Sequence, residues 1–380
     1  MCHPSSERRR FLARVSAAGA ALAVGAGPMP AARAAPGDPS QGAVEAGPYR
    51  CPPCGCSMDG QDFSSPGTCP ACGMTLVPKN PPFEPDRLMP GTGLFVTRGG
   101  IGRGGARIGV HYILPRTFTP RSAILIVIPG AGRDGDEYRD AWVPVAEEKG
   151  ILVAALTYPE ADYDFAAYHL GGVVKDLALR NMPLGPDGRP PRRIFLQDED
   201  ISFTLETDRS RWLFRDFDRI FDLIVRATGS LRASYDLFGH SAGGQILHRS
   251  VLFQPGLRAD RVIAANAGLY TMPDRTLPMP VGLKGFALDD AALAASLSGP
   301  LTVMLGERDD DRETGGTLLH TPRIDRFGTH RLARGRAVFA AARAKAEALS
   351  VPFRWRVEIV PDVGHDFRAM SRAAARVLYG

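Results

Sequence analysis

A serine, an aspartate and a histidine are spaced along this chain so that they could combine into a nucleophile and its base. Ser241 is the centre of the pentapeptide Gly-His-Ser-Ala-Gly at 239–243, which lies between a short β-type run and a helical stretch. A serine on such a tight strand-to-helix turn has strained backbone angles and needs small neighbours two residues away on each side. Gly239 and Gly243 meet that need, so Ser241 is our candidate nucleophile.

The acid and the base follow in the order that this kind of serine turn requires. Asp309 is the first of three aspartates just beyond a predicted strand, and His365 lies on the loop before the closing helix. Because G-x-S-x-G turns are followed along the chain by an acid and then a histidine, we expect His365 to take the proton of Ser241 and Asp309 to orient the imidazole. The acids that remain open as alternatives are Asp310, Asp311 and Asp274.

Two backbone N–H groups could stabilise an oxyanion next to Ser241. One belongs to Ala242, directly after the serine. The other is expected from the glycine-rich turn 130–132 after the first buried strand, where Ala131 is the best match. A tight turn without a catalytic role is the alternative for this loop.

Strand and helix patterns alternate from residue 93 onward, which predicts a mostly parallel sheet with right-handed crossovers. The continuous apolar run 123–128 is typical of a strand buried on both faces. Two irregular stretches, 158–170 and 181–207, are expected to cover the active-site face. The predicted elements are a hairpin at 94–97 and 107–114, strands at 123–128, 151–156, 233–238, 261–265, 301–305 and 353–359, and helices at 136–149, 212–228, 243–252, 332–349 and 366–377.

With Ser241, Asp309 and His365 in this order, residues 93–380 resemble the α/β-hydrolase fold, a mostly parallel central sheet flanked by helices. Within that superfamily they are most similar to secreted polyester depolymerases and feruloyl esterases. The resemblance implies a serine carboxylic-ester hydrolase that acts through an acyl-enzyme on a small or polymeric ester, with no cofactor for catalysis. Two other functions stay open: a serine peptidase, and a metal-binding or metal-trafficking protein with a non-catalytic hydrolase-like domain.

A second set of residues suited to chemistry is the cysteine-rich segment 49–79. The pattern Cys-Pro-x-Cys-Gly occurs there twice, with fourteen residues between the pairs. Each such turn points two thiolates the same way, and its glycine lets backbone N–H groups approach the sulfurs. The spacing predicts a zinc-ribbon-like module with structural Zn²⁺, because four thiolates leave no open position for water. The predicted ligands are Cys51, Cys54, Cys69 and Cys72.

This segment resembles zinc ribbons, and its ending, Pro-Gly-Thr-Cys-Pro-Ala-Cys-Gly-Met-Thr-Leu at 66–76, is similar to short heavy-metal-binding modules of copper-handling proteins. Those modules usually start with Cys-Pro-Met-His, whereas here the start is Cys-Pro-Pro-Cys-Gly-Cys. The difference favours zinc over copper. Cu(I) stays open as an alternative because Cys56, Met58 and Met74 add soft sulfurs. A rubredoxin-like iron site and a pair of disulfides also stay open.

The N-terminal 34 residues resemble a twin-arginine export signal, with Arg-Arg-Arg-Phe-Leu at 8–12, a weakly apolar stretch and an A-x-A cleavage site. They hold five arginines and one acid, a contribution of +4 to the net charge of +5, so the rest of the chain carries only +1. This leaves no electrostatic case for nucleic-acid binding. We expect a periplasmic or secreted protein with linkers at 35–48 and 80–92 and no membrane span in the mature chain.

Overall fold

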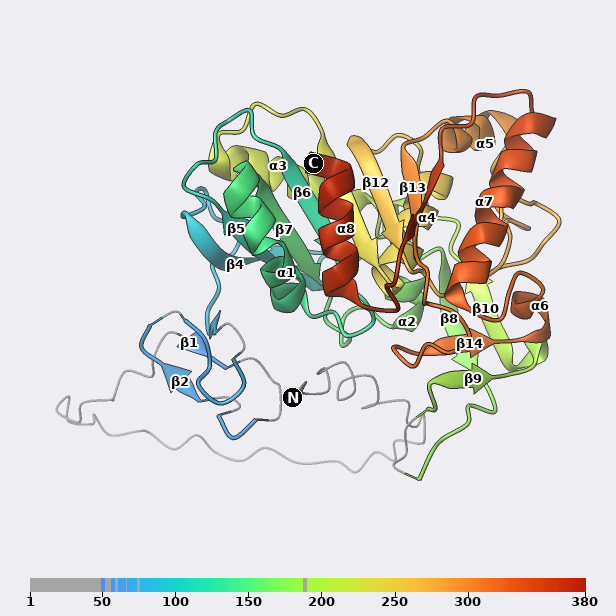
Figure 1. The fold of residues 1–380 in the computed structure, drawn as a ribbon, viewed down its shortest axis with the longest axis horizontal. Coiled ribbons are helices and arrows are strands. Elements are labelled where there is room, and N and C mark those ends of the chain that lie inside the picture. The colour runs from blue at the N-terminus through green and yellow to red at the C-terminus, as the bar shows by residue number, and fades with distance from the viewer. Residues whose placement is uncertain (1–48, 52–55, 59–60, 66, 74–75, 187–189) are drawn as a thin grey trace, which may run out of the picture. The chain divides into compact units, whose positions relative to one another are not determined.

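The computed structural model describes residues 49–380 apart from 52–55, 59–60, 66, 74–75 and 187–189. These residues form two compact units that divide between Asn80 and Pro81 (Figure 1). The predicted signal and the linker 35–48 lie outside the described residues. Within the segment predicted as the second linker, Leu88 is buried and its N–H donates to the main-chain oxygen of Ala227 at 3.0 Å. The large unit therefore begins at Pro81, ahead of the predicted residue 93.

The large unit is built on an eight-stranded sheet in the order β15-β13-β12-β11-β6-β7-β5-β4. Strands β4 and β5 pair antiparallel, as do β5 and β7, and the other neighbours pair parallel. The parallel strands β6 and β11 are buried along their whole length, as the continuous apolar run predicted. The strands of the sheet are β4 (Gly91–Arg98), β5 (Arg107–Leu114), β6 (Ile124–Ile128), β7 (Leu152–Thr157), β11 (Tyr235–His240), β12 (Ala259–Ala265), β13 (Leu301–Gly306) and β15 (Arg356–Val360).

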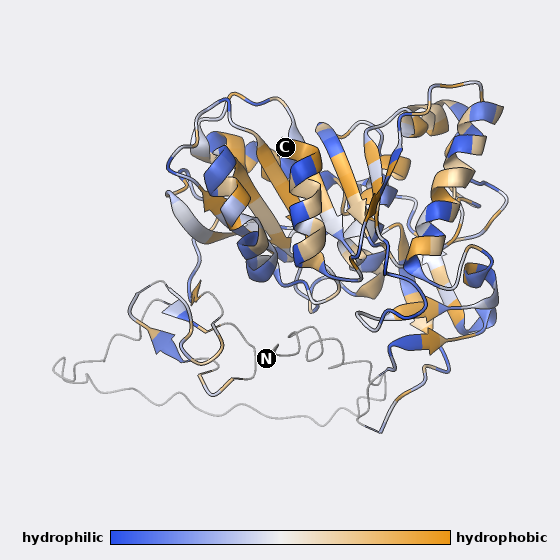
Figure 2. Ribbon diagram, viewed as in Figure 1, coloured by the Kyte–Doolittle hydropathy of each residue, from blue (hydrophilic) through white to orange (hydrophobic). Residues whose placement is uncertain are grey.

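Helices cover both faces of this sheet, so the predicted α/β architecture is confirmed. One face is covered by α1 (Gly135–Lys149) and α8 (Phe367–Tyr379), which lie side by side in Figure 1. The other face packs against α3 (Arg215–Thr228), α4 (Ala242–Phe253), α5 (Asp290–Leu297) and α7 (Arg331–Ala348). Figure 2 shows the central strands as predominantly hydrophobic between these two layers. Among the described residues, no helix combines the length and apolarity that crossing a bilayer requires.

Smaller elements fill the stretches that the sequence left irregular. Strands β8 (Val174–Leu179) and β10 (Ile201–Leu205) form an antiparallel pair, and β9 (Arg193–Phe195) pairs in parallel with β14 (Leu318–His320). Two short helices, α2 (Phe165–His169) and α6 (Pro322–Asp325), accompany them. Of these elements, α2 lies in the predicted irregular stretch 158–170, and β9 and β10 lie in the stretch 181–207, whereas β8, β14 and α6 lie outside both.

The small unit is a three-stranded sheet in the order β2-β1-β3, with β1 (Tyr49–Arg50), β2 (Asp62–Phe63) and β3 (Val77–Pro78). Both β2 and β3 pair antiparallel with β1, and Cys51 follows β1 directly. The buried apolar cluster of its described residues consists of Cys51, Cys69 and Leu76. A core this small cannot stabilise a fold by hydrophobic burial alone.

Candidate active site

Ser241 occupies a strained turn between β11 and α4. Its backbone angles are φ 57° and ψ −115°, which an L-residue adopts only at a cost. The flanking glycines are required sterically: a Cβ at Gly243 would lie 2.0 Å from the main-chain oxygen of Ile128, and one at Gly239 would lie 2.5 Å from the main chain of Gly243. Helix α4 starts at Ala242, whose N–H has no partner within the helix because it belongs to the first turn.

The three side chains singled out in the sequence come together at the carboxyl ends of three parallel strands. Ser241 follows β11, Asp309 follows β13 and His365 follows β15. His365 Nε2 lies 3.1 Å from Ser241 Oγ, and His365 Nδ1 lies 2.8 Å from Asp309 Oδ2. The His365 and Asp309 side chains are each 1% exposed, whereas Ser241 remains partly accessible. A hydroxyl, an imidazole and a carboxylate joined in this order can pass a proton from the hydroxyl to the imidazole.

The neighbouring acids have other contacts. Asp310 is ion-paired with Arg312 at 2.7 Å, and hydrogen bonds from Arg312 lower the pKa of Asp310 to about 2. The Asp311 side chain is 59% exposed and accepts from Thr329 Oγ1. Asp274 accepts hydrogen bonds from the main-chain N–H and the hydroxyl of Thr276, two residues further along. Asp309 is thus the acid that contacts the imidazole of His365, whereas Asp310, Asp311 and Asp274 contact residues near them in the chain or on the surface.

A buried arginine lies on the other side of Asp309. Arg331 Nη1 lies 3.1 Å from Asp309 Oδ1, and the Arg331 side chain is only 4% exposed. The same guanidinium donates to the main-chain oxygens of Gly315 and Thr317. Burial raises the pKa of Asp309, but the charges and hydrogen bonds of His365 and Arg331 outweigh it and hold the pKa below the ordinary value. The carboxylate is therefore kept in its charged form.

The loop that carries His365 is fixed by two further polar side chains. Glu313 Oε2 accepts the His365 main-chain N–H at 2.6 Å, and Glu313 Oε1 accepts two N–H groups of its own loop. The buried Asn266 donates to the Gly364 main-chain oxygen at 2.9 Å and accepts the Gly306 N–H at 2.7 Å. These contacts link the histidine loop to the end of β13, next to the aspartate.

His240, beside the serine, is completely buried against the imidazole of His365. The two ring centroids are 4.6 Å apart, and His240 Nδ1 lies 3.0 Å from the Tyr138 hydroxyl. Burial lowers the pKa of His240 well below its ordinary value, and the charges of His365 and Arg331 lower it further. His240 is thus a neutral packing partner. Tyr138 and Trp142 are both buried in the core.

The loop after β6, where the second oxyanion donor was expected, lies against the nucleophile. A Cβ at Gly130 would be 3.5 Å from Ser241 Cβ, which places the following residue, Ala131, close to the serine turn. Arg133, in the same loop, anchors it to neighbouring segments. Its Nη1 donates to the main-chain oxygens of Tyr158 and Tyr163 at 2.8 and 2.6 Å, and its guanidinium carbon lies 4.5 Å from the Tyr168 ring centroid. The loop is therefore packed into one conformation next to Ser241.

Three further histidines have structural contacts. His248 Nε2 accepts the Thr271 N–H at 2.9 Å, and His320 Nδ1 lies 3.0 Å from Asp325. His330 caps α7 by accepting the Ala333 N–H.

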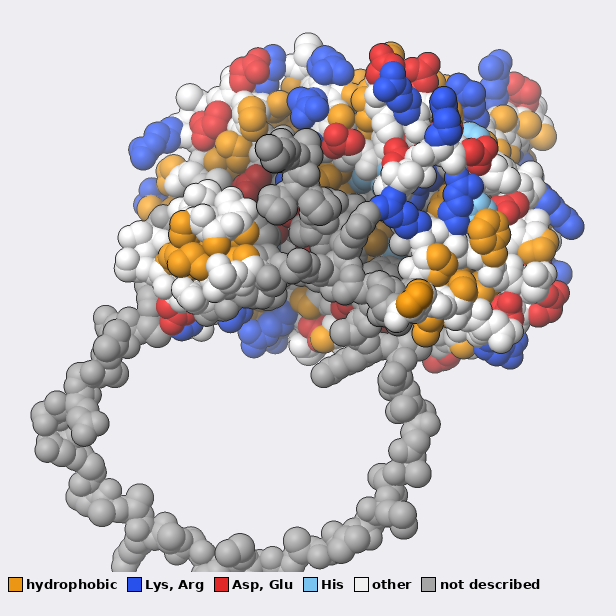
Figure 3. All heavy atoms as spheres, turned by 60° about the horizontal axis from the view of Figure 1, so that its bottom comes forward, with side chains coloured by type: hydrophobic (Ala, Val, Ile, Leu, Met, Phe, Trp, Pro, Cys, Tyr) orange, Lys and Arg blue, Asp and Glu red, His pale blue; other side chains and the backbone are white. Residues whose placement is uncertain are grey.

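A cavity of about 290 Å³ adjoins the histidine loop. Its basic lining residues are Arg192, Arg193, Arg312, His330 and Arg331, and its acidic ones are Asp310, Asp311 and Glu313. A Cβ at Gly316, another lining residue, would be 2.8 Å from His365 Cδ2, so one wall of the cavity lies against the imidazole. Figure 3 shows basic and acidic side chains interspersed on the surface of the large unit.

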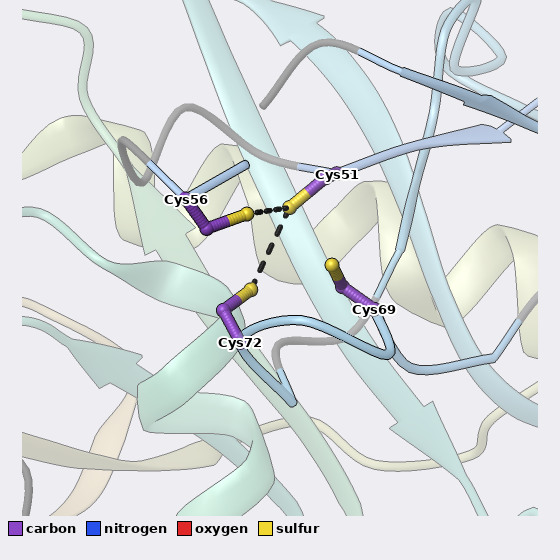
Figure 4. Close-up of side chains that lie close together, drawn as sticks. All are labelled: Cys51, Cys56, Cys69 and Cys72. Carbon is purple, nitrogen blue, oxygen red and sulfur yellow. Dashed lines mark hydrogen bonds between the residues drawn. The ribbon is translucent and has the colours of Figure 1, made fainter. Parts of the chain in front are cut away.

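The small unit brings together four thiols that could hold a metal ion. The sulfurs of Cys51, Cys56, Cys69 and Cys72 all lie within 4.8 Å of one another (Figure 4). Three of them were predicted as ligands, the fourth predicted ligand, Cys54, lies outside the described residues, and Cys56 was noted only as a fifth thiol. No two of the four clustered sulfurs form a disulfide.

Hydrogen bonds favour the thiolate form of Cys69 in this cluster. Burial raises the pKa of the Cys69 thiol, but backbone hydrogen bonds from Ala71 and Cys72, together with the thiols of Cys51 and Cys72, lower it to about 7. A thiolate is the form that binds a metal.

Comparison with known proteins agrees with this fold. No protein-family model matches the chain, and no curated protein matches it. Among solved structures, poly(aspartic acid) hydrolase-1 from Sphingomonas sp. KT-1 is 36% identical, with 77% of this chain and 100% of that chain covered and a TM-score of 0.64. A poly(3-hydroxybutyrate) depolymerase from Bordetella parapertussis is 28% identical, with 77% and 90% covered and a TM-score of 0.64.

A mostly parallel sheet with a serine on the sharp turn after its central strand defines the α/β-hydrolase class, so the resemblance seen in the sequence is confirmed. The identity to the Sphingomonas protein over that protein's whole length goes further. This chain belongs to the α/β-hydrolase superfamily, in the same family as that enzyme, and is a hydrolase.

Proposed function

We propose that the protein is a serine hydrolase of carboxylic esters, with Ser241 as nucleophile, His365 as general base and acid, and Asp309 as the group that orients the imidazole. One observation carries this proposal: the unbroken contacts of 3.1 Å from Ser241 to His365 and 2.8 Å from His365 to Asp309. The accessible, strained serine supports the same assignment, because a serine held for packing alone has no need of such a turn.

The reaction has two halves. Ser241 Oγ attacks the ester carbonyl carbon while its proton moves to His365 Nε2, and the intermediate collapses by expelling the alcohol, which takes that proton. Water then attacks the acyl-enzyme, gives its proton to His365, and the carboxylic acid leaves as Ser241 recovers the proton. Asp309 stabilises the imidazolium in each half, and the N–H groups of Ala131 and Ala242 would donate to the carbonyl oxygen as it becomes negative.

Labelling with a fluorophosphonate probe tests the nucleophile. The wild-type protein should be labelled, Ser241→Ala should not, and Ser250→Ala, a serine on the same helix whose hydroxyl bonds to Leu247, should be labelled like the wild type. Absence of labelling in the wild type would favour a non-catalytic domain. A series of p-nitrophenyl esters of increasing chain length would then define the acyl preference.

A second candidate substrate is a polyamide that carries carboxylates. Its support is the arginine-rich cavity beside His365, together with the 36% identical relative, which is named a poly(aspartic acid) hydrolase. Within the part of the chain that the structure describes, Arg192 contacts the main-chain oxygen of Thr314 and no carboxylate, which leaves its charge for an anionic chain. Comparing rates on poly(aspartic acid) and poly(3-hydroxybutyrate), in the wild type and in Arg192→Ala, separates the two candidates: only the anionic polymer should lose rate in the variant.

For the small unit we propose a Zn²⁺ ion bound by four thiolates that include Cys51, Cys69 and Cys72. The role of this ion would be structural, because four thiolates leave no open position for substrate. We also propose export to the periplasm or beyond through the twin-arginine signal at residues 1–34. Replacing Arg8 and Arg9 by lysine should retain the protein in the cytoplasm, as measured by cell fractionation.

A further inference from the structure

The cysteine cluster contains a sulfur that the two Cys-x2-Cys pairs do not supply. Cys56 Sγ lies 3.8 Å from Cys51 Sγ, and Cys72 Sγ lies 3.6 Å from the same atom (Figure 4). The four sulfurs of Cys51, Cys56, Cys69 and Cys72 converge within 4.8 Å. They come from the segment after β1 and from the turn that precedes β3.

These distances match a tetrahedral site. Zinc binds thiolates at about 2.3 Å, so the sulfurs at the corners of a regular tetrahedron are roughly 3.8 Å apart. The distances from Cys51 Sγ to the sulfurs of Cys56 and Cys72, 3.8 and 3.6 Å, agree with that edge length. A disulfide would require sulfurs about 2.05 Å apart, so the cluster has the dimensions of a metal site and not of paired disulfides.

The backbone around Cys56 is arranged as it is around a thiolate ligand. The Met58 N–H donates to Cys56 Sγ at 3.3 Å, and the turn is closed by the Gln61 N–H, which donates to the Met58 main-chain oxygen at 3.0 Å. Met58 itself packs on the buried cluster of Cys51, Cys69 and Leu76.

We propose that Cys56 is a ligand of the metal, so that the site is formed by Cys51, Cys56, Cys69 and Cys72 with the spacing Cys-x4-Cys and Cys-x2-Cys. This rests on the proposed metal binding and changes its ligand set: four thiolates fill a tetrahedron, so Cys54 is not required. On binding, each thiol loses its proton to solvent and the metal is not oxidised or reduced. The site is structural, because its tetrahedron is closed.

Metal analysis of the full-length chain and three single variants tests the assignment. The wild type should contain about one zinc per chain. In competition with a chelator, Cys56→Ser and Cys72→Ser should each show a lower metal affinity than the wild type. The decrease should exceed the roughly 10- to 100-fold that loss of an outer-shell contact costs. The matched control, Cys54→Ser, should retain the metal with wild-type affinity. Fluorophosphonate labelling of Ser241 reports separately that the hydrolase unit of each variant is folded.

Alkylation of the metal-loaded wild type provides a test that does not depend on a variant's folding. Iodoacetamide followed by mass spectrometry should modify Cys54 and spare Cys56. Modification of Cys56 with protection of Cys54, or retention of the metal by Cys56→Ser, would overturn the assignment. A wild type without metal would overturn the metal-binding proposal itself, which is thereby distinguished from failure of the ligand set alone.

Discussion

Replacing Arg331 by methionine tests how much the order of the site depends on the cation behind Asp309. Opposite charges 3.1 Å apart attract each other by about 5 kcal/mol at an effective dielectric constant of roughly 20. Methionine keeps an apolar stem but leaves the aspartate with one partner fewer, and it removes the donor to the Gly315 and Thr317 oxygens. Removal of one member of a buried ion pair costs about 3–5 kcal/mol. We therefore expect the free energy of unfolding to fall by about 3 kcal/mol in a urea titration.

Activity should fall because Asp309 is no longer held from both sides. We expect kcat for ester hydrolysis to decrease about tenfold to 100-fold, equivalent to about 1.4–2.8 kcal/mol of transition-state stabilisation, with KM little changed. Because Arg331 lowers the pKa of Asp309, the variant should also lose activity at a higher pH on the acid side. Arg331→Lys, which keeps the charge but not the forked geometry, should lie between the two. Equal unfolding free energies and coincident acid limbs in the wild type and the methionine variant would refute the reasoning.

Three further predictions concern packing and pH. Tyr138→Phe removes the hydroxyl that lies 3.0 Å from His240 Nδ1, so urea unfolding should show a loss of about 1 kcal/mol; an unchanged midpoint would contradict this. Gly243→Ala places a methyl group 2.0 Å from a main-chain oxygen of β6 and should not yield folded protein, whereas Gly256→Ala, with no atom within 4 Å, should melt like the wild type. The pKa of Asp309 is lowered from 3.8, so its stabilising effect is present above that pH and is lost as pH falls through the folded-state pKa. Asp309→Asn should therefore show a flatter dependence of melting temperature on pH below about pH 4, and parallel curves would argue against it.

The sheet and its main helices could be predicted because their signals are local. The expected helix at 136–149 is α1 (Gly135–Lys149), and the expected strand at 151–156 is β7 (Leu152–Thr157). The pairs β8–β10 and β9–β14 were missed for a physical reason. Strand β8 is mostly exposed or half-exposed, so it lacks an apolar pattern, and β9 is too short to show a period.

The triad residues could be predicted from their order along the chain and their places after strands. The residues that hold the aspartate and the histidine loop in position could not. Arg331 is 22 residues from Asp309, and Glu313 is 52 residues from His365. No periodicity connects such pairs, because the contact depends on how separate loops meet at one edge of the sheet. Cys56 was missed as a cluster member for a related reason: the repeated Cys-x2-Cys spacing is visible in the sequence, whereas the turn that carries Cys56 toward Cys51 is not.

One local feature of the sequence does point to Arg331. It is the first residue of α7, whose first turn contains no acid, so its positive charge opposes the helix dipole. The structure compensates from another part of the chain: the Asp309 main-chain oxygen accepts the Leu332 N–H at 3.1 Å, and its carboxylate binds the Arg331 guanidinium. The aspartate thus acts as the missing acid at the helix start. Since natural sequences depart from such local rules mainly at functional sites, an arginine at the start of a helix without a nearby acid indicates that a carboxylate arrives from elsewhere, and here that carboxylate is the one that we propose orients the base.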